Sequence, residues 1–203
     1  MDAAVTKTPT ISGTPYAGGF YVGRYQIDGQ LFALIVANKA EGELPGQWNS
    51  TLDTVNGAAS YNNGLTNTNA MAEAGSDLAK AALALRINNL DDWFIPARDE
   101  LELCYRYLKP STYADNMWRA GDNPSSVPPG YPYTEQSPAQ TINEAFQKDG
   151  AEAFDIAWYW ASTQNANGSD YAWMQTFSDG TQHDRHKSYE GRARAVRRTL
   201  VIE

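Results

Sequence analysis

Two β-rich runs separated by Asp28-Gly29 constrain the fold of this chain more than any other feature. The runs are FYVGRYQI at residues 20–27 and QLFALIVAN at residues 30–38. Aspartate followed by glycine between two strands favours a type I′ turn, because both turn residues need a positive φ. The stretch LFALIV is apolar throughout, which predicts a central strand covered on both faces. The sequence therefore predicts an antiparallel hairpin inside a sheet.

Helical patterns occupy part of the middle of the chain. Apolar residues in the segment 68–86 fall near one face of a helix, and Gly75 predicts a break or two helices there. DDWFIP at residues 91–96 predicts a short buried extended segment. Residues 98–108 then predict an amphipathic helix, with Cys104 among its apolar positions.

Irregular segments and further strands complete the pattern. We expect loops at residues 39–67 and a long irregular excursion at residues 110–138, which hold six of the ten prolines. A short helix is expected within residues 139–154. Strand patterns return from residue 158 as WYWAST, YAWMQTF, TQHDRH and a closing RARAVRRTLVI. Early strands, then helices, a loop and a terminal antiparallel sheet are typical of an α+β domain. We also expect the first and last strands to pair, which would bring the chain ends together.

The length of 203 residues leaves one or two domains open, and the α+β order of elements favours one, over residues 16–203. Residues 1–15 are rich in Thr, Pro and Gly, which predicts an N-terminal arm or linker. The start of the chain has neither a basic segment nor an apolar run, so no signal peptide is expected. No stretch approaches the roughly 18 apolar residues of a membrane span, so no membrane insertion is expected.

Charge and cysteine content exclude several classes of function. The net charge of −8 argues against nucleic-acid binding. A single cysteine, Cys104, excludes internal disulfides and cysteine-based zinc clusters, and its apolar neighbours predict a buried thiol. Residues 183–198 carry six basic against two acidic residues. This cluster could attract an anion, but we favour ion pairs between Arg192–Arg198 and carboxylates elsewhere in the fold.

Candidate catalytic and metal-binding groups form no recognisable set. His183 and His186 flank Asp184, but in a strand these histidines would lie on opposite faces, and no third ligand is evident. Ser162 and Thr163 lack the G-x-S-x-G surroundings of a nucleophile, which favours hydrogen bonding to backbone. We therefore expect no enzymatic activity, no metal and no cofactor.

The segment 159–198 instead alternates anchors with adaptable side chains. Trp160, Trp173 and Phe177 have the character of scaffold residues. An active site needs a few groups in fixed relation, whereas a contact surface needs many adaptable ones. The residues expected to face a ligand are Asn165, Asn167, Asp170, Tyr171, Met174, Thr176, Ser178, Thr181, His183, Asp184, Arg185, His186, Ser188 and Tyr189.

Four segments, in order, resemble a known family. DDWFIPARDELELCYRYL is similar to the W-x-[IL]-P-[ST]-x-x-E-L strand–helix unit of bacterial and phage C-type-lectin-fold domains, the Lcl C-terminal-like group. YWASTQ resembles its Y-W-[ST]-S-T segment, and AWMQTFSDG and RARAVRR resemble its aromatic hairpin and closing strand. The resemblance covers roughly residues 90–198. It implies a C-type lectin fold in which two helices pack on a twisted antiparallel sheet, with the Pro-rich loop as an insertion.

The chain departs from that pattern in two respects. Ala97 replaces the Ser or Thr that caps the helix, although Glu100 of the capping box remains. The Glu-Pro-Asn and Trp-Asn-Asp calcium motifs of sugar-binding animal lectins are absent from the sequence. The resemblance therefore does not imply calcium-dependent sugar binding.

Within this group, the segment 159–198 most resembles the variable proteins of diversity-generating retroelements. The resemblance implies that residues 165–189 form a sequence-variable surface that recognises a protein or glycan receptor on a target cell. It further implies a phage tail or bacterial cell-surface location, with attachment to a larger particle through the N-terminus. Two alternatives stay open: a formylglycine-generating enzyme of related fold, which needs a reactive cysteine, and a structural assembly subunit.

Overall fold

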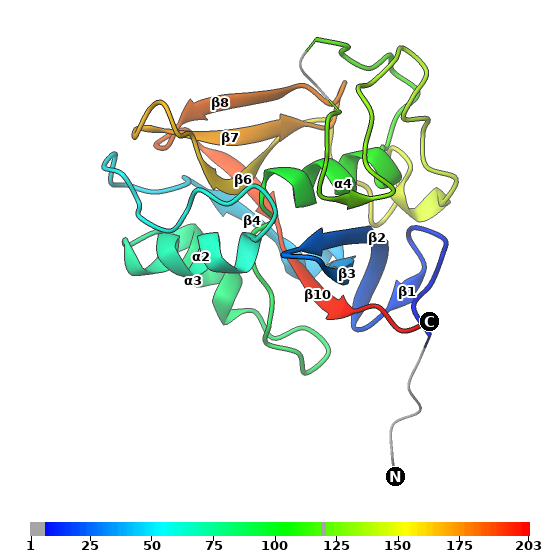
Figure 1. Ribbon diagram of the computed structural model, residues 1–203, viewed down its shortest axis with the longest axis horizontal. Helices are drawn as coiled ribbons and strands as arrows, with labels where there is room; N and C mark the ends of the chain where they lie inside the picture. Colours follow the sequence, from blue (N-terminus) through cyan, green and yellow to red (C-terminus); the bar gives the residue numbers. More distant parts are fainter. Residues whose placement is uncertain (1–6, 119–120) are drawn as a thin grey trace.

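The computed structural model describes residues 7–118 and 121–203, which form an α+β fold with two five-stranded sheets (Figure 1). The helices are α1 (Lys39–Gly42), α2 (Gly64–Glu73), α3 (Asp77–Ala84) and α4 (Arg98–Leu108), with a 3₁₀ turn at Glu144–Phe146. The strands are β1 (Pro15–Tyr16), β2 (Gly19–Ile27), β3 (Gln30–Val36), β4 (Glu43–Gly46), β5 (Ser126–Val127), β6 (Trp158–Gln164), β7 (Tyr171–Thr176), β8 (Gln182–His186), β9 (Gly191–Arg194) and β10 (Val196–Leu200).

The first sheet contains the predicted hairpin. Its strand order is β1-β2-β3-β10, and β5 also pairs with β2. Ile27 pairs with Gln30, and the turn residues Asp28 and Gly29 have φ values of 49° and 80°, as the Asp-Gly sequence predicts. The second half of β3 is fully buried between its neighbours and the layers on either face. The prediction of a central, covered strand is therefore confirmed there.

The second sheet has the order β4-β9-β6-β7-β8. Its pairs are antiparallel except for β6 and β9, which are parallel. The expectation of a single sheet with one closing strand is wrong, because RARAVRRTLVI divides at Ala195 into β9 and β10, one in each sheet. Ala195 is fully buried at the crossing, where its amide donates to Gly42 and its carbonyl accepts from Ala37.

Helix α4 lies between the two sheets and forms the centre of the core (Figure 1). Leu101, Cys104, Tyr105 and Leu108 are buried, as the helical period predicts. The segment expected as one interrupted helix forms two, α2 and α3, separated by Gly75 at φ 99°. They cover the second sheet from the other side, with Met71, Leu78 and Ala82 buried. The structure thus has four helices among its described residues, not two.

Segments expected as loops contain short paired elements. Strand β4 forms within residues 39–67 and pairs with β9, although its sequence ELPG contains proline and glycine. The Pro-rich excursion at residues 110–138 is irregular as predicted, apart from β5. The extended segment at residues 91–96 is buried, and Phe94 bridges to Val196.

The two ends of the described chain lie side by side. The amide of Thr8 donates to the carbonyl of Ile202 at 3.0 Å, and the amide of Ile202 donates to the Thr8 hydroxyl at 2.9 Å. The last strand pairs with β3, and the first strand pairs with β2. Residues 8–14, expected within an arm, therefore contact the body of the fold, while residues 1–6 of that expected arm lie outside the described residues.

Candidate ligand-binding surface

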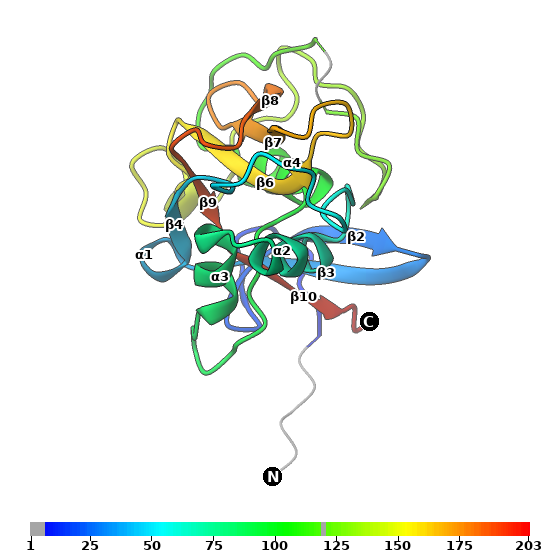
Figure 2. The same ribbon diagram turned by 90° about the vertical axis from the view of Figure 1, so that its left-hand side faces the viewer.

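Strands β7 and β8 form an outer ribbon of the second sheet, at the end of the molecule away from the chain ends (Figures 1 and 2). In their antiparallel register Tyr171 pairs with His186, and Trp173 pairs with Asp184. The turn between the strands is fixed on α4, because Gly180 at φ 75° lies against Tyr105. A Cβ atom at position 180 would collide with that ring, so the turn needs glycine both for its conformation and for its fit.

The fourteen residues expected to face a ligand fall into three groups by exposure. Six are exposed: Asn167, Tyr171, His183, Arg185, Ser188 and Tyr189. Six are half-buried: Asn165, Asp170, Ser178, Thr181, Asp184 and His186. Met174 and Thr176 are buried.

The expectation that Met174 and Thr176 of β7 face a ligand is therefore wrong. Met174 and Thr176 lie on the same face of the strand as Ala172, and Met174 belongs to the apolar cluster around Trp160. Trp173, expected as a buried anchor, points to the other face and is half-buried. The anchors Trp160 and Phe177 are fully buried, as predicted.

Ring contacts order exposed side chains on both faces of the ribbon. The Arg185 guanidinium lies 5.2 Å from the ring centroid of Trp158 and 6.0 Å from that of Tyr189. Tyr171 and His186 meet edge to face with centroids 5.8 Å apart. Such stacking limits the conformational freedom of these side chains, so part of the entropy cost of a contact is met before any partner binds.

A buried lysine fixes the chain beneath this surface. Lys187 is fully buried, and its Nζ donates to the Asp53 carbonyl and to Gln164 Oε1 at 2.7 and 2.8 Å. It also lies over the ring of Trp48, at 4.7 Å from the centroid. Burial lowers its pKa to about 8. Sequence reasoning missed this residue, because nothing in the polar run around it distinguishes an inward-pointing lysine.

The arginines of β9 and β10 belong to the scaffold. Arg192 bonds Glu43 and Asp155, and Arg194 pairs with Glu152. Arg197 forms a bidentate pair with Asp92 at 2.7 and 2.8 Å. The preference for ion pairs over an anion site in this cluster is confirmed for these residues.

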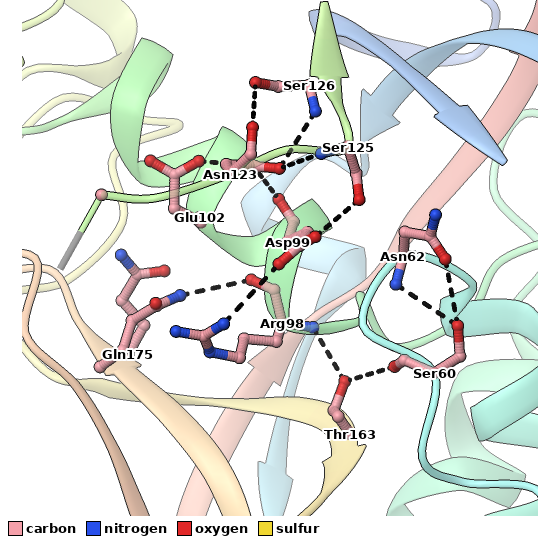
Figure 3. Close-up of polar contacts among 12 residues, drawn as sticks. Ser60, Asn62, Arg98, Asp99, Glu102, Asn123, Ser125, Ser126, Thr163 and Gln175 are labelled. Carbon is pink, nitrogen blue, oxygen red and sulfur yellow. Dashed lines mark hydrogen bonds and ion pairs between the residues drawn. The ribbon is translucent and has the colours of Figure 1, made fainter. Parts of the chain in front are cut away.

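A cavity of about 220 Å³ lies between β7, β8 and the start of α4, on the face of β7 that carries Tyr171 and Trp173. Arg98 reaches from the first turn of α4 toward the second sheet (Figure 3). Its guanidinium lies 4.7 Å from the ring centroid of Trp173 and 5.1 Å from that of Tyr61. The residues lining the cavity are Arg98, Trp118, Trp173, Gln182, His183 and Asp184.

The start of α4 is capped from β6. Ala97 offers no side-chain cap, but the Thr163 hydroxyl accepts from the Arg98 amide at 3.0 Å and donates to the Ser60 carbonyl (Figure 3). Glu100 Oε2 accepts from the Ala97 amide at 2.7 Å. The hydroxyl missing from the helix start is therefore supplied by a neighbouring strand, and the expected backbone role of Thr163 is confirmed.

Buried carboxylates join α4 to its surroundings. Burial raises the pKa of Glu100 to about 7, although it accepts hydrogen bonds from Tyr25 and from two backbone amides. Burial also raises the pKa values of Asp99 and Glu102. These two carboxylates bond Ser125 and Asn123, which ties the Pro-rich excursion to the helix (Figure 3).

The remaining chemical candidates have structural surroundings. Cys104 is fully buried, and burial raises the pKa of its thiol well above its usual value. His183 bonds the Asp184 carbonyl, and His186 bonds the Ser188 hydroxyl. Across residues 7–118 and 121–203, no group of three or more His, Cys, Asp or Glu side chains is arranged to hold a metal ion. The same residues contain no helix long and apolar enough to span a membrane.

What this surface can do is inferred from its geometry and its side chains. Comparison with known protein families finds no family model that matches the chain, and comparison with curated proteins finds no match. The ribbon combines a fixed, internally bonded base with an exposed outer layer of aromatic, basic and small polar side chains. Chemically, such a surface can bind a partner by aromatic area, charge and adaptable hydrogen bonds.

Proposed function

We propose that this protein is a binding module of the C-type lectin fold that recognises a receptor through the exposed side chains of its β7–β8 ribbon and of the turn that follows it. The observation that carries the proposal is the division of this segment by exposure. Five exposed side chains, Tyr171, His183, Arg185, Ser188 and Tyr189, form the contact surface. They alternate with residues that are buried or bonded to the scaffold, so the outer layer can change while its base stays in place.

Several features support the lectin-type fold. The four segments that carry the family resemblance form a single arrangement around α4. The extended segment at residues 91–96 leads into that helix, and β6, β7 and β9 lie together in the second sheet. The adjacent chain ends also fit this reading.

The contact surface has the composition of an adaptable recognition site. Tyrosine and arginine supply much of the energy in protein interfaces, and small polar residues supply adjustable hydrogen bonds. Its ligand in this proposal is a protein or glycan receptor on a target cell, recognised from a phage tail or a bacterial surface. The buried Cys104, whose thiol pKa is raised, gives no support to the alternative of cysteine-dependent oxidation.

A triple substitution tests the proposal. Replacing Tyr171, Arg185 and Tyr189 together by Ala removes the large exposed groups of the contact surface. We expect binding of the purified protein to target-cell envelopes to fall by at least about 100-fold, since interface anchors of this kind contribute roughly 2 kcal/mol or more each. The melting temperature should change by only a few degrees.

A matched triple variant provides the control. Tyr113→Ala, Tyr131→Ala and Arg86→Ala remove the same side-chain types from exposed positions outside the ribbon. This control should bind envelopes as the wild type does. Equal loss in both triple variants, or unfolding of the ribbon variant, would contradict the assignment of the contact surface.

The gene offers an independent test of diversification. The flanking DNA should contain a reverse transcriptase gene and a template repeat that matches the segment, with differences confined to adenines of the template. Because Met174 is buried, we expect those differences to concentrate at codons for exposed residues. A gene without such a repeat would remove the retroelement from the proposal and leave the binding module to the variant test.

A further inference from the structure

Three asparagine–glycine pairs occur in the sequence, at residues 56–57, 63–64 and 167–168. Such a pair is chemically labile, because the glycine amide nitrogen can attack the side-chain carbonyl carbon of the asparagine and glycine has no Cβ to hinder the approach. The attack needs an unbonded carboxamide, an unbonded glycine amide and room for the backbone to rotate. The folded structure therefore decides which of the three pairs can react.

The pair Asn63–Gly64 is restrained in all three respects. The Asn63 carboxamide oxygen caps α2 by accepting from the Thr66 amide at 3.3 Å, and it also accepts from Arg198 at 2.9 Å. Gly64 is buried, and its amide donates to Glu100 at 3.0 Å. A reaction here would have to break these bonds and open the start of α2, so the folded state protects this pair.

The pair Asn167–Gly168 lies at the surface, in the loop between β6 and β7. Asn167 is exposed and Gly168 is half-buried. Within residues 7–118 and 121–203, neither the Asn167 carboxamide nor the Gly168 amide forms a hydrogen bond. The nearest atoms to a Cβ placed on Gly168 belong to Tyr171 and Asp170 of the same loop, so the contacts around it are local. The two reacting groups are therefore available to each other.

We propose that Asn167 is a site of spontaneous deamidation in the folded protein. The Gly168 amide nitrogen loses its proton and bonds to Asn167 Cγ, the Cγ–Nδ2 bond breaks, and the side-chain nitrogen leaves with that proton as ammonia. Water then opens the resulting succinimide ring at either carbonyl, which leaves aspartate or isoaspartate. The reaction needs only water, and its occurrence does not depend on the proposed receptor-binding function.

The modification would reach the contact surface through the loop. Asn165 accepts from the Asn167 backbone amide at 2.7 Å and donates to Asp184 at 2.8 Å, so the new carboxylate joins a loop already linked to an acidic side chain. Isoaspartate also lengthens the backbone by one carbon before Gly168, whose carbonyl accepts from the Tyr171 amide at 3.1 Å. Because Tyr171 is an exposed ring of the contact surface, we expect weaker receptor binding, an effect that rests on the proposed function.

Peptide mapping by mass spectrometry tests the site on the full chain. The folded protein is incubated at mildly alkaline pH, and conversion is followed at all three pairs. We expect conversion at Asn167 and at Asn56, whose pair is also exposed, and at least about tenfold slower conversion at Asn63, which must first unfold locally. In urea all three pairs should convert at similar rates, since only folding separates them.

A variant locates the reacting nitrogen. Gly168→Ala adds a Cβ that the ring of Tyr171, at 3.2 Å, can accommodate by a small shift. This variant should slow conversion at Asn167 about tenfold or more by hindering the attack, while conversion at Asn56 stays as in the wild type. Two results would overturn the proposal: an intact Asn167 in folded protein whose Asn56 has converted, or conversion at Asn63 as fast as at Asn167.

The effect on binding is measured separately. In an Asn56→Gln background, anion exchange separates protein modified at Asn167 from unmodified protein of the same age. The modified form should bind envelopes at least about threefold more weakly, because the position of an interface aromatic is disturbed. Equal binding would remove this effect and leave the modification site standing. If the contact-surface triple variant keeps its envelope binding, the proposed function falls, whereas the peptide map decides the deamidation site independently.

Discussion

Arg194 in β9 and Arg185 in β8 are the same amino acid in neighbouring parts of one sheet, yet their surroundings are opposite. Arg194 has no exposed surface, and it donates to the Ala37 carbonyl and to Glu152 at 2.9 and 3.0 Å. Arg185 is exposed and rests on the rings of Trp158 and Tyr189. The first is part of the interior, and the second is part of the molecule's outer layer.

The difference arises from what covers each strand. Residues of other segments, among them Glu43 and Glu152, surround the side chains of β9. The exposed Arg185 of β8 rests on neighbours in the second sheet and in the turn after it. Exposure within a strand is therefore set by the packing of distant segments, and it decides which positions can tolerate change.

Truncating the two arginines should give the largest contrast in stability. Arg194→Ala leaves the carboxylate of Glu152 without its arginine partner, while Glu43 keeps Arg192, so the free energy of unfolding should fall by about 3 kcal/mol. Arg185→Ala should cost at most about 1 kcal/mol, the scale of an exposed cation–π contact. Urea denaturation of both variants measures this, and similar losses would break the comparison.

Tyr171 and Met174, on opposite faces of β7, provide the second contrast. Met174→Ala opens a cavity in the apolar cluster around Trp160 and should cost about 3 kcal/mol. Tyr171→Ala removes an exposed ring and should cost well under about 1 kcal/mol. Thermal unfolding followed by circular dichroism distinguishes the two faces of the strand. A stable Met174→Ala protein would mean that Met174 faces a ligand after all.

The buried carboxyl of Glu100 should make the stability of the protein depend on pH. The folded pKa of Glu100 is about 7, above its ordinary value of 4.5, so the folded state holds a proton that the unfolded state has released. Its stabilising contribution is present below pH 4.5 and is lost as pH rises through 7, a loss of about 2 kcal/mol between pH 5 and 7.

Glu100→Gln should remove that part of the decline. Urea midpoints at pH 5 and pH 7 provide the measurement, with the wild type as reference. Asp99 and Glu102, whose pKa values are also raised, should leave a smaller residual decline of the same sign. An unchanged pH dependence in Glu100→Gln would show that the carboxyl does not titrate in this range.

Local patterns predicted the parts of the fold that local interactions specify. The hairpin follows from Asp28-Gly29, and α4 follows from its helical period. No local pattern marks the division of the closing strand at Ala195, because the alternation of arginine with apolar residues continues through that position. Strand β4 was also missed, since pairing with β9 imposes extended structure on a Pro-Gly sequence.

The candidate site was predicted in part for similar reasons. Six of its expected residues are exposed, but both faces of β7 carry large side chains, so the sequence YAWMQT does not distinguish them. The sequence therefore predicted an exposed Met174 and a buried Trp173, whereas Met174 is buried and Trp173 is half-buried. The cavity could not be found from the segment itself, because Arg98 and Trp118 reach it from distant parts of the chain.

The hydrogen bonds between Thr8 and Ile202 bring the chain ends together, far from the β7–β8 ribbon in both views (Figures 1 and 2). An affinity tag or surface linker joined near either residue would leave the molecule on the same side. Immobilisation through either end should therefore hold the protein in one orientation, with the ribbon directed into solution. A peptide linker joining the two ends would also permit circular permutation, with new ends opened in the exposed excursion around Glu135.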